Sequence, residues 1–130
     1  MKKDGKNSIL IVDDEAMCID FLLSLLGDDY TVYVAKNGNS AITAAMNNTP
    51  DLIVMDINMP DISGYDVISA LRFMRETVRI PVVFFSGSDE PRAMEKGLTF
   101  GAVDYIHKNL GADAIMHKIS EQIDLINAKG

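Results

Sequence analysis

The sequence predicts a single α/β domain, a doubly wound sandwich in which five parallel strands alternate with five helices. The length of 130 residues suits one domain. Five short runs rich in β-branched and aromatic residues recur along the chain, and segments with helical periodicity separate them. Several runs are apolar throughout, as in the strands of a parallel sheet that helices cover on both faces.

The predicted strands are the five apolar runs, 9–12, 31–34, 52–55, 82–85 and 105–106. The first reads Ile-Leu-Ile-Val and the fourth Val-Val-Phe-Phe, without a polar residue. The run 31–34 is followed only by Ala35 and Lys36, as expected of a strand at the edge of the sheet. Glycine and proline residues lie at or near the joins, which supports this division.

The predicted helices have apolar residues three or four positions apart, the spacing of one helical face. In the first three helices these residues are Ile19, Leu22, Leu23 and Leu26; Ala41, Ile42 and Ala45; and Val67, Ile68 and Leu71. The fourth helix, 91–99, is short, and its expected anchors are Ala93, Met94 and Leu98. The last helix has a one-sided stripe that predicts core packing, formed by Ile115, Ile119, Ile123 and Ile126.

Residues 1–7 are expected to form a solvated tail and residues 8–128 the folded domain, with no linker to a second domain. The composition is that of a globular protein, with 48% hydrophobic and 24% charged residues. The net charge of −7 argues against direct contact with nucleic acid or with an anionic membrane, because lysine and arginine drive binding to both.

Cys18 is the single cysteine, so an internal disulfide is impossible. Its neighbours Met17 and Ile19 suggest a small buried thiol. This cysteine usage fits a reducing, cytoplasmic location. No segment has the character of a signal peptide or of a membrane span.

Chemistry is expected beyond the carboxyl ends of the strands, where open parallel sheets bind their ligands. The chemically active groups at these ends are Asp13, Asp14 and Glu15 after the first strand, Asp56 after the third, Ser86 after the fourth, and His107 and Lys108 at the end of the fifth. In the flavodoxin-like strand order 2-1-3-4-5 the first and third strands are neighbours. This order brings Asp13, Asp14 and Asp56 together.

Three carboxylates in one pocket need a shared proton or a cation. Two unit charges about 4 Å apart repel by roughly 4 kcal/mol at an effective dielectric constant of about 20. Hard oxygen ligands, without a well-placed thiol or imidazole, favour Mg²⁺ or Mn²⁺ over zinc. Ser86 would add a neutral donor and Lys108 a positive charge across the sheet from Asp56. The arrangement suits a phosphoryl group on one carboxylate.

Each of these residues also has a purely structural interpretation. Asp14 or Glu15 could cap the first helix, and Asp56 could open a turn before Pro60 and Gly64. The lysine and the serine, taken singly, would be ordinary surface groups. Their joint placement on four strand ends is what favours a metal and phosphate site.

Three segments carry a family resemblance: Asp13-Asp14, Val54-Met55-Asp56-Ile57-Asn58-Met59-Pro60 with Gly64 downstream, and Gly101-Ala102-Val103-Asp104-Tyr105-Ile106-His107-Lys108. With them, the chain from Ile9 to about Ile126 resembles the receiver domains of two-component response regulators, including chemotaxis regulators. The three segments together are far more specific than an aspartate pair alone.

The resemblance implies a phosphoacceptor rather than an enzyme. Asp56 would take a phosphoryl group from a histidine kinase or a histidine phosphotransfer domain. Asp14 and Asp56 would ligate Mg²⁺ through their side chains, Asn58 through its backbone carbonyl, and Asp13 chiefly through a bound water.

The resemblance also implies a switch. Lys108 and Ser86 would contact phosphoryl oxygens, and movement of Ser86 would be coupled to an inward swing of Tyr105. The surface of the fourth helix, fifth strand and fifth helix would then signal to a downstream protein or effector domain, and a homodimer is possible. The chain departs from the family pattern at two positions. Lys108-Asn109 replaces the usual Lys-Pro, so a trans peptide bond is expected there. Ser86 replaces the frequent threonine, so looser coupling between phosphorylation and the switch is expected.

Two competing functions are weighed against this one. A degenerate receiver would fold but act only as a protein-interaction module. A Mg²⁺-dependent phosphohydrolase of the haloacid-dehalogenase type would need an aspartate two residues after its nucleophile, where Asp13 is followed by Glu15 and Asp56 by Asn58. No strand is followed by a glycine-rich nucleotide-binding loop, and neither histidine, at 107 or 117, has the spacing of a metal ligand.

Overall fold

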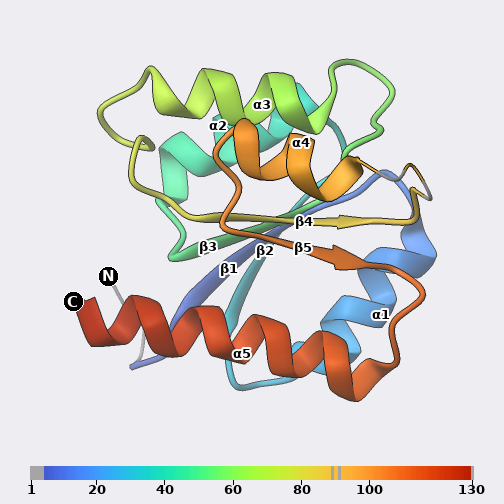
Figure 1. The fold of residues 1–130 in the computed structure, drawn as a ribbon. Helices are drawn as coiled ribbons and strands as arrows, with labels where there is room; N and C mark the ends of the chain where they lie inside the picture. Colours follow the sequence, from blue (N-terminus) through green and yellow to red (C-terminus); the bar gives the residue numbers. More distant parts are fainter. Residues whose placement is uncertain (1–4, 89, 91, 130) are drawn as a thin grey trace.

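The computed structural model describes residues 5–88, 90 and 92–129, and over this part of the chain strands and helices alternate as predicted (Figure 1). The strands are β1 (Ser8–Val12), β2 (Thr31–Ala35), β3 (Leu52–Met55), β4 (Val82–Ser86) and β5 (Asp104–His107). The helices are α1 (Ala16–Leu26), α2 (Gly38–Asn48), α3 (Gly64–Arg72), α4 (Ala93–Thr99) and α5 (Ala112–Lys129).

The five strands form one parallel sheet in the order β2-β1-β3-β4-β5, which confirms the predicted topology. Helices α2, α3 and α4 cover one face, and α1 and α5 cover the other (Figure 1). Strand β2 lies at the edge, as predicted, and is mostly half-buried, whereas β1, β3 and β4 are buried throughout.

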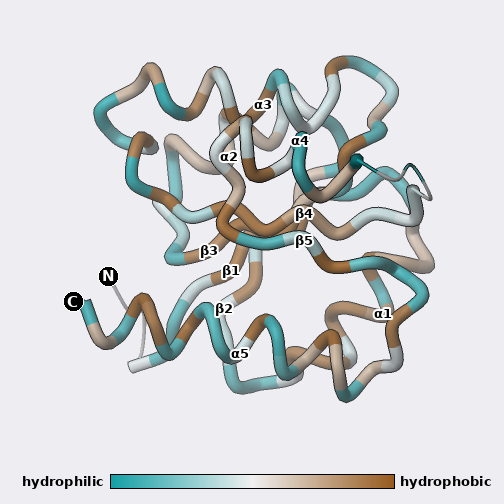
Figure 2. Tube along the Cα trace, viewed as in Figure 1, coloured by the Kyte–Doolittle hydropathy of each residue, from teal (hydrophilic) through white to brown (hydrophobic). Residues whose placement is uncertain are grey.

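Two apolar layers, one on each face of the sheet, form the core. Alternate residues of a strand point to opposite faces, so Leu10 and Val12 of β1 join the layer under α2, α3 and α4, while Ile9 and Ile11 join the layer over α1 and α5. Figure 2 shows the resulting concentration of apolar residues along the central strands. The apolar faces predicted for α3 and α5 pack into these layers.

The register of the sheet places the ends of β1 and β3 side by side. Val12 pairs with Met55, so the next residues, Asp13 and Asp56, leave the sheet at the same level. The backbone N–H of Asp56 still donates to the carbonyl of Val12 at 2.9 Å, and that of Asp13 donates to Ala35 at 3.1 Å. Both carboxylates therefore start from backbone that the sheet holds.

The fourth helix differs from its prediction. It begins at Ala93, and Pro91, the predicted start, lies outside the described residues. Ala93 is buried, but Met94 and Leu98 are 53% and 47% exposed, and Gly97 faces inward instead. A side chain at Gly97 would meet the ring of Phe84, with its Cβ 3.0 Å from Cδ2. The helix thus packs closely through small residues, and its longer apolar side chains are left on the surface.

Two further expectations are corrected near the start of the chain. Met17 is 85% exposed and Cys18 is half-buried, because the apolar face of α1 is formed by Ile19 and the residues that follow at helical spacing. Asn7, assigned to a solvated tail, is buried, whereas Gly5 and Lys6 are exposed. The amide of Asn7 donates to Asn127 on α5 at 3.0 Å and accepts from it at 3.1 Å.

No helix within the described residues is long and apolar enough to cross a membrane.

Candidate functional site

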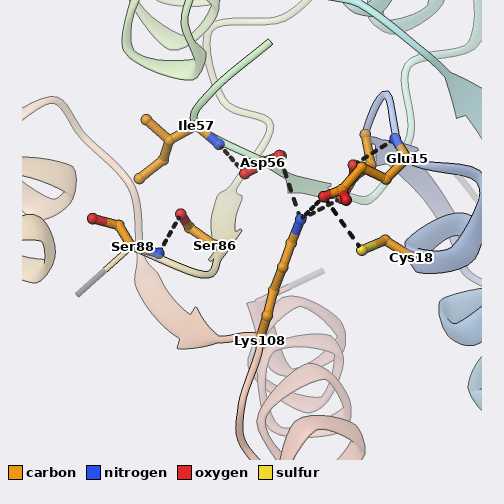
Figure 3. A network of polar contacts seen from close by, with 8 residues as sticks. Glu15, Cys18, Asp56, Ile57, Ser86, Ser88 and Lys108 are labelled. Atoms are coloured by element: carbon orange, nitrogen blue, oxygen red, sulfur yellow. Dashed lines mark hydrogen bonds and ion pairs between the residues drawn. The ribbon is translucent and has the colours of Figure 1, made fainter.

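Lys108 contacts carboxylates from several elements at the carboxyl edge of the sheet (Figure 3). Its Nζ lies 2.9 Å from Oδ2 of Asp13, 3.3 Å from Oε1 of Glu15 and 3.4 Å from Oδ2 of Asp56. The side chains of Asp13, Asp56 and Lys108 are only 1%, 8% and 15% exposed. Three of the four predicted strand ends therefore meet in one ionic cluster, in which Asp13 and Asp56 are buried and Glu15 is exposed.

The acidic groups are close enough to share one cation. Asp13, Asp14, Glu15 and Asp56 each offer an oxygen, and these oxygens all lie within 4.8 Å of one another. Oδ2 of Asp13 is buried, and apart from the Lys108 ammonium 2.9 Å away it has no polar partner among the described residues. This oxygen keeps lone pairs for a metal, and the hard, anionic donor set fits Mg²⁺ or Mn²⁺.

Burial and charge oppose one another at this cluster. Burial raises the pKa of Asp56 above its usual value and the charge of Asp13 adds to the rise, while the Lys108 charge and the Ile57 N–H act against it. Burial by itself would lower the pKa of Lys108, but its hydrogen bond with Asp13 and the charges of Asp56 and Asp13 raise that pKa overall. Lys108 is thus held as a cation beside Asp56.

Asn58 and Ser86, which were also predicted for the site, line a hollow beside the carboxylates that has a volume of about 520 Å³. Its walls are Asp14, Glu15, Asp56, Asn58, Ser86, Gly87, Ser88 and Lys108. Asn58 is exposed at the rim, whereas the Ser86 side chain is buried at the end of β4. The hollow therefore combines carboxylates, a hydroxyl and an ammonium.

Tyr105 lies outside the acidic hollow but is linked to it through Ser88. The backbone N–H of Ser88 donates to Oγ of Ser86 at 3.3 Å, and the Tyr105 hydroxyl donates to the Ser88 carbonyl at 3.4 Å. Tyr105 is 7% exposed and lines a second hollow of about 500 Å³. This hollow lies among α4, β5 and α5, and its walls are Ser88, Glu90, Ala93, Met94, Tyr105, His107, Leu110 and Lys118.

Sequence reasoning underestimated Glu15. Glu15 is the N-cap residue of α1, but its side chain makes no capping hydrogen bond and points to Lys108 (Figure 3). The alternation of strands and helices could not show this, because the direction of a side chain at a helix start depends on the neighbouring strands. Cys18 lies beside this cluster, with Sγ 3.8 Å from Oε1 of Glu15, and burial raises the pKa of its thiol.

Asp61 is a second residue that the sequence reasoning did not single out. It lies in the loop between β3 and α3, and its carboxylate accepts hydrogen bonds from Gly38 and Asn39, both at 2.8 Å. The N–H groups of Asn39 and Gly38 lower the pKa of Asp61 to about 2. An acid between Pro60 and α3 is the only sequence signal, and it does not indicate a partner on α2.

Other expectations concern the segment after β5. The described residues contain no cis peptide bond, so the Lys108-Asn109 bond is trans, as expected. Nδ1 of His107 accepts a hydrogen bond from the Asn109 N–H at 3.0 Å, and Nε2 of His117 lies 3.9 Å from the Glu121 carboxylate. Both contacts fit the structural or solvent-facing positions expected for the histidines.

The structure is that of an α/β protein with an open parallel sheet and a polar site at the carboxyl edge of this sheet. Comparisons with known proteins identify its family. Residues 9–120 match the response regulator receiver domain family. The chain is 34% identical over 112 residues to a probable cyclic di-GMP phosphodiesterase of Vibrio cholerae, covering 86% of this chain and 25% of that protein. It is 32% identical over 120 residues to the probable transcriptional regulatory protein TcrX of Mycobacterium tuberculosis, covering 91% and 50%.

Solved structures show the same fold. A CheY-like response regulator receiver domain protein from Methanospirillum hungatei superposes with a TM-score of 0.87 at 24% identity, covering 97% of this chain and all of that one.

The chain belongs to the response regulator receiver domain family. It spans about a quarter to a half of the length of the two curated relatives. Receiver domains are generally not catalytic enzymes, and the phosphodiesterase name belongs to a protein of which this chain covers a quarter.

Proposed function

We propose that this domain accepts a phosphoryl group on Asp56 from a histidine kinase or a histidine phosphotransfer domain. The observation that supports this most is the setting of Asp56. It is a buried carboxylate 3.4 Å from the Lys108 ammonium, in a cluster with three other acids, and it lines the same hollow as the Ser86 hydroxyl. A structural aspartate would have no need of this constellation.

The proposed transfer is a displacement at phosphorus. An oxygen of Asp56 forms a bond to phosphorus while the bond from phosphorus to the imidazole nitrogen of the donor breaks, and that nitrogen keeps the electron pair. Lys108 stays protonated and pairs with a phosphoryl oxygen, and Ser86 donates a hydrogen bond to another. The Asp56 carboxylate must be ionised for the attack, and the adjacent ammonium favours that form.

Asp14 and Asp56 would hold Mg²⁺ through side chains, Asn58 through its carbonyl and Asp13 through a water. When bound, Mg²⁺ would neutralise the carboxylates and the phosphoryl oxygens. Mn²⁺ would serve in the same way, since it too prefers oxygen ligands.

Ser86 and Tyr105 are the proposed switch. Because Ser88 bonds to both residues, a shift of Ser86 toward a phosphoryl group would disturb the position of the Tyr105 hydroxyl. This would change the shape of the hollow beside Tyr105 and so the surface that α4, β5 and α5 form together. A downstream protein, an effector domain or a second copy of the chain would bind the changed surface. We place this signalling in the cytoplasm and without direct nucleic-acid or membrane contact.

The test is the intact mass of the protein after incubation with acetyl phosphate and Mg²⁺. We expect a single added phosphoryl group. It should be absent from Asp56→Asn and from a sample treated with EDTA. Asp20→Asn, which changes an exposed acid on α1, serves as the matched control and should be modified like the unaltered protein.

The alternatives give other results. A degenerate receiver would show no adduct and would form no beryllofluoride complex. A phosphohydrolase would release inorganic phosphate over many turnovers from stable phosphomonoesters, which a receiver would leave intact.

A further inference from the structure

The loop that follows the proposed phosphoacceptor is attached to a helix distant in sequence. This loop, residues 57–63, connects β3 to α3. At its outer part, Oδ1 of Asp61 accepts from the N–H of Gly38, and Oδ2 accepts from the N–H of Asn39, each at 2.8 Å. The two partners are the first residues of α2, 22 and 23 positions away.

The first turn of α2 is therefore capped from two sides. The N–H groups at the start of a helix lack partners within the helix. Asn37, the N-cap, accepts from the N–H of Ser40 through its side chain at 2.8 Å and from Ala41 through its carbonyl at 3.0 Å. Asn37 is local to the helix, whereas Asp61 joins the helix to the site loop.

Packing reinforces this connection. A Cβ at Gly38 would clash with Cγ1 of Ile62. Ile62 is half-buried and packs on the core layer under α2 and α3. The absence of a side chain at Gly38 thus lets the loop lie directly on the helix, next to the two hydrogen bonds of Asp61.

The inner part of the loop is fixed at the phosphoacceptor itself. The Gly64 N–H donates to the Ile57 carbonyl at 2.7 Å, and the Ile57 N–H donates to Oδ1 of Asp56 at 2.8 Å. Asn58, at the rim of the acidic hollow, lies between this closed base and the Asp61 attachment. The orientation of the Asn58 carbonyl depends on both ends of the segment.

We propose that Asp61 is a positioning residue for the metal: by fastening the loop to α2 it orients the Asn58 carbonyl toward the acidic hollow. The inference rests on the proposed Mg²⁺ role of that hollow. Asp61 supplies no metal ligand, and loss of its carboxylate removes none. Its effect on the metal is exerted through the loop backbone.

The test compares two caps of the same helix by Mg²⁺ titration calorimetry on the folded protein, with urea unfolding measured in parallel. Asp61→Ala should weaken Mg²⁺ binding about 10-fold, as losses of groups that orient metal ligands do. Asn37→Ala removes a hydrogen bond from the same first turn without touching the loop. It should lower stability yet leave the Mg²⁺ dissociation constant within about 2-fold of the unaltered protein.

Gly38→Ala is a second, independent test of the contact between the loop and α2. It keeps Asp61 and improves the intrinsic helix preference of α2, but its methyl group displaces Ile62, so Mg²⁺ binding should weaken here too. Two results would overturn this inference alone. In the first, Asp61→Ala and Asn37→Ala weaken Mg²⁺ binding equally. In the second, the unaltered protein binds Mg²⁺ and Asp61→Ala binds it just as well. Failure of the unaltered protein to bind Mg²⁺ overturns the proposed function as well.

Discussion

At the scale of single residues, Lys108 is surrounded by negative charge. It is one ammonium among three carboxylates within 3.4 Å, and two of these, Asp13 and Asp56, are buried. Removing one member of a buried ion pair leaves charge without compensation, which is costly. The residue therefore stabilises the fold as well as the proposed phosphoryl group.

We predict that Lys108→Met destabilises the metal-free protein by about 3 kcal/mol, because Asp13 and Asp56 then repel one another without a cation. Added Mg²⁺ should restore part of this loss, since it replaces the missing positive charge. Urea unfolding in EDTA and in saturating Mg²⁺ measures both effects. Lys118→Met, which removes a half-buried lysine 3.6 Å from Asp104, is the control. An equal loss in both variants would contradict the prediction.

Asp61 gives a prediction for pH dependence. Its pKa in the folded protein is about 2, whereas an unperturbed aspartate has a pKa of about 4. The lowered pKa means that Asp61 stabilises the fold fully above pH ~4, and that this contribution is lost as the pH falls from ~4 to ~2. The unfolding midpoint of the unaltered protein should exceed that of Asp61→Asn at pH 6, and the gap should close toward pH 2. A gap independent of pH would refute this assignment.

At the scale of elements, the start of α3 is held both by its own cap and by contact with Asp56. Ser63 and Asp66 form a reciprocal capping box there. The first residue, Gly64, lies against the backbone of Asp56, the proposed phosphoacceptor. A Cβ at this position would be 2.7 Å from the carbonyl oxygen of Asp56 and 2.8 Å from Cε1 of Phe84. Backbone contact of this kind cannot be relieved by a change of rotamer.

We predict that Gly64→Ala destabilises the protein by about 1–3 kcal/mol through overpacking and lowers the rate of phosphorylation by acetyl phosphate, because α3 must move away from Asp56. Gly111→Ala is the matched control: no atom lies within 4 Å of its added Cβ, so its effect on stability should be within about 0.5 kcal/mol. Chemical denaturation and the time course of the phosphorylated mass measure the two quantities. A neutral Gly64→Ala would show that α3 is free to shift.

At the scale of the whole molecule, one sheet separates two core layers. Leu71 belongs to the layer under α2, α3 and α4, and Ile119 to the layer over α1 and α5, and both are fully buried. Each layer packs on the same central strands. Loss of either layer exposes one face of the sheet, so the two layers should unfold together.

We predict that Leu71→Ala and Ile119→Ala each lower the free energy of unfolding by about 2–5 kcal/mol. The two losses should add in the double variant, because the sites lie on opposite faces of the sheet. Unfolding should remain a single transition. Far-UV circular dichroism reports on the helices, and tyrosine fluorescence reports on tertiary packing, since the chain has four tyrosines and no tryptophan. Transitions that fail to coincide in the two signals would argue for independent layers.

Much of this architecture could be predicted because its signals are local. The continuous apolar runs of β1, β3 and β4 indicate strands that are buried on both faces. The isoleucines of α5, spaced three or four residues apart, indicate one buried helix face. A parallel sheet then brings its strand ends to one edge, which places Asp13, Asp56 and Lys108 together. Ala93 anchors α4 as predicted, but the prediction is wrong for Met94 and Leu98, because the approach of α4 to the sheet depends on Gly97, whose lack of a side chain carries no hydrophobic signal.

The sequence by itself determined the order of strands and helices, the two-faced burial and the set of chemical groups at the strand ends, because each follows from periodicity and from the geometry of a parallel sheet. The tertiary structure decided which acid faces which cation. The side chain of Glu15 points to Lys108 instead of capping α1, and Asp61 caps α2 from a distant loop. Such contacts join segments remote along the chain, and their geometry is set by how helices pack on the sheet, which no local pattern encodes.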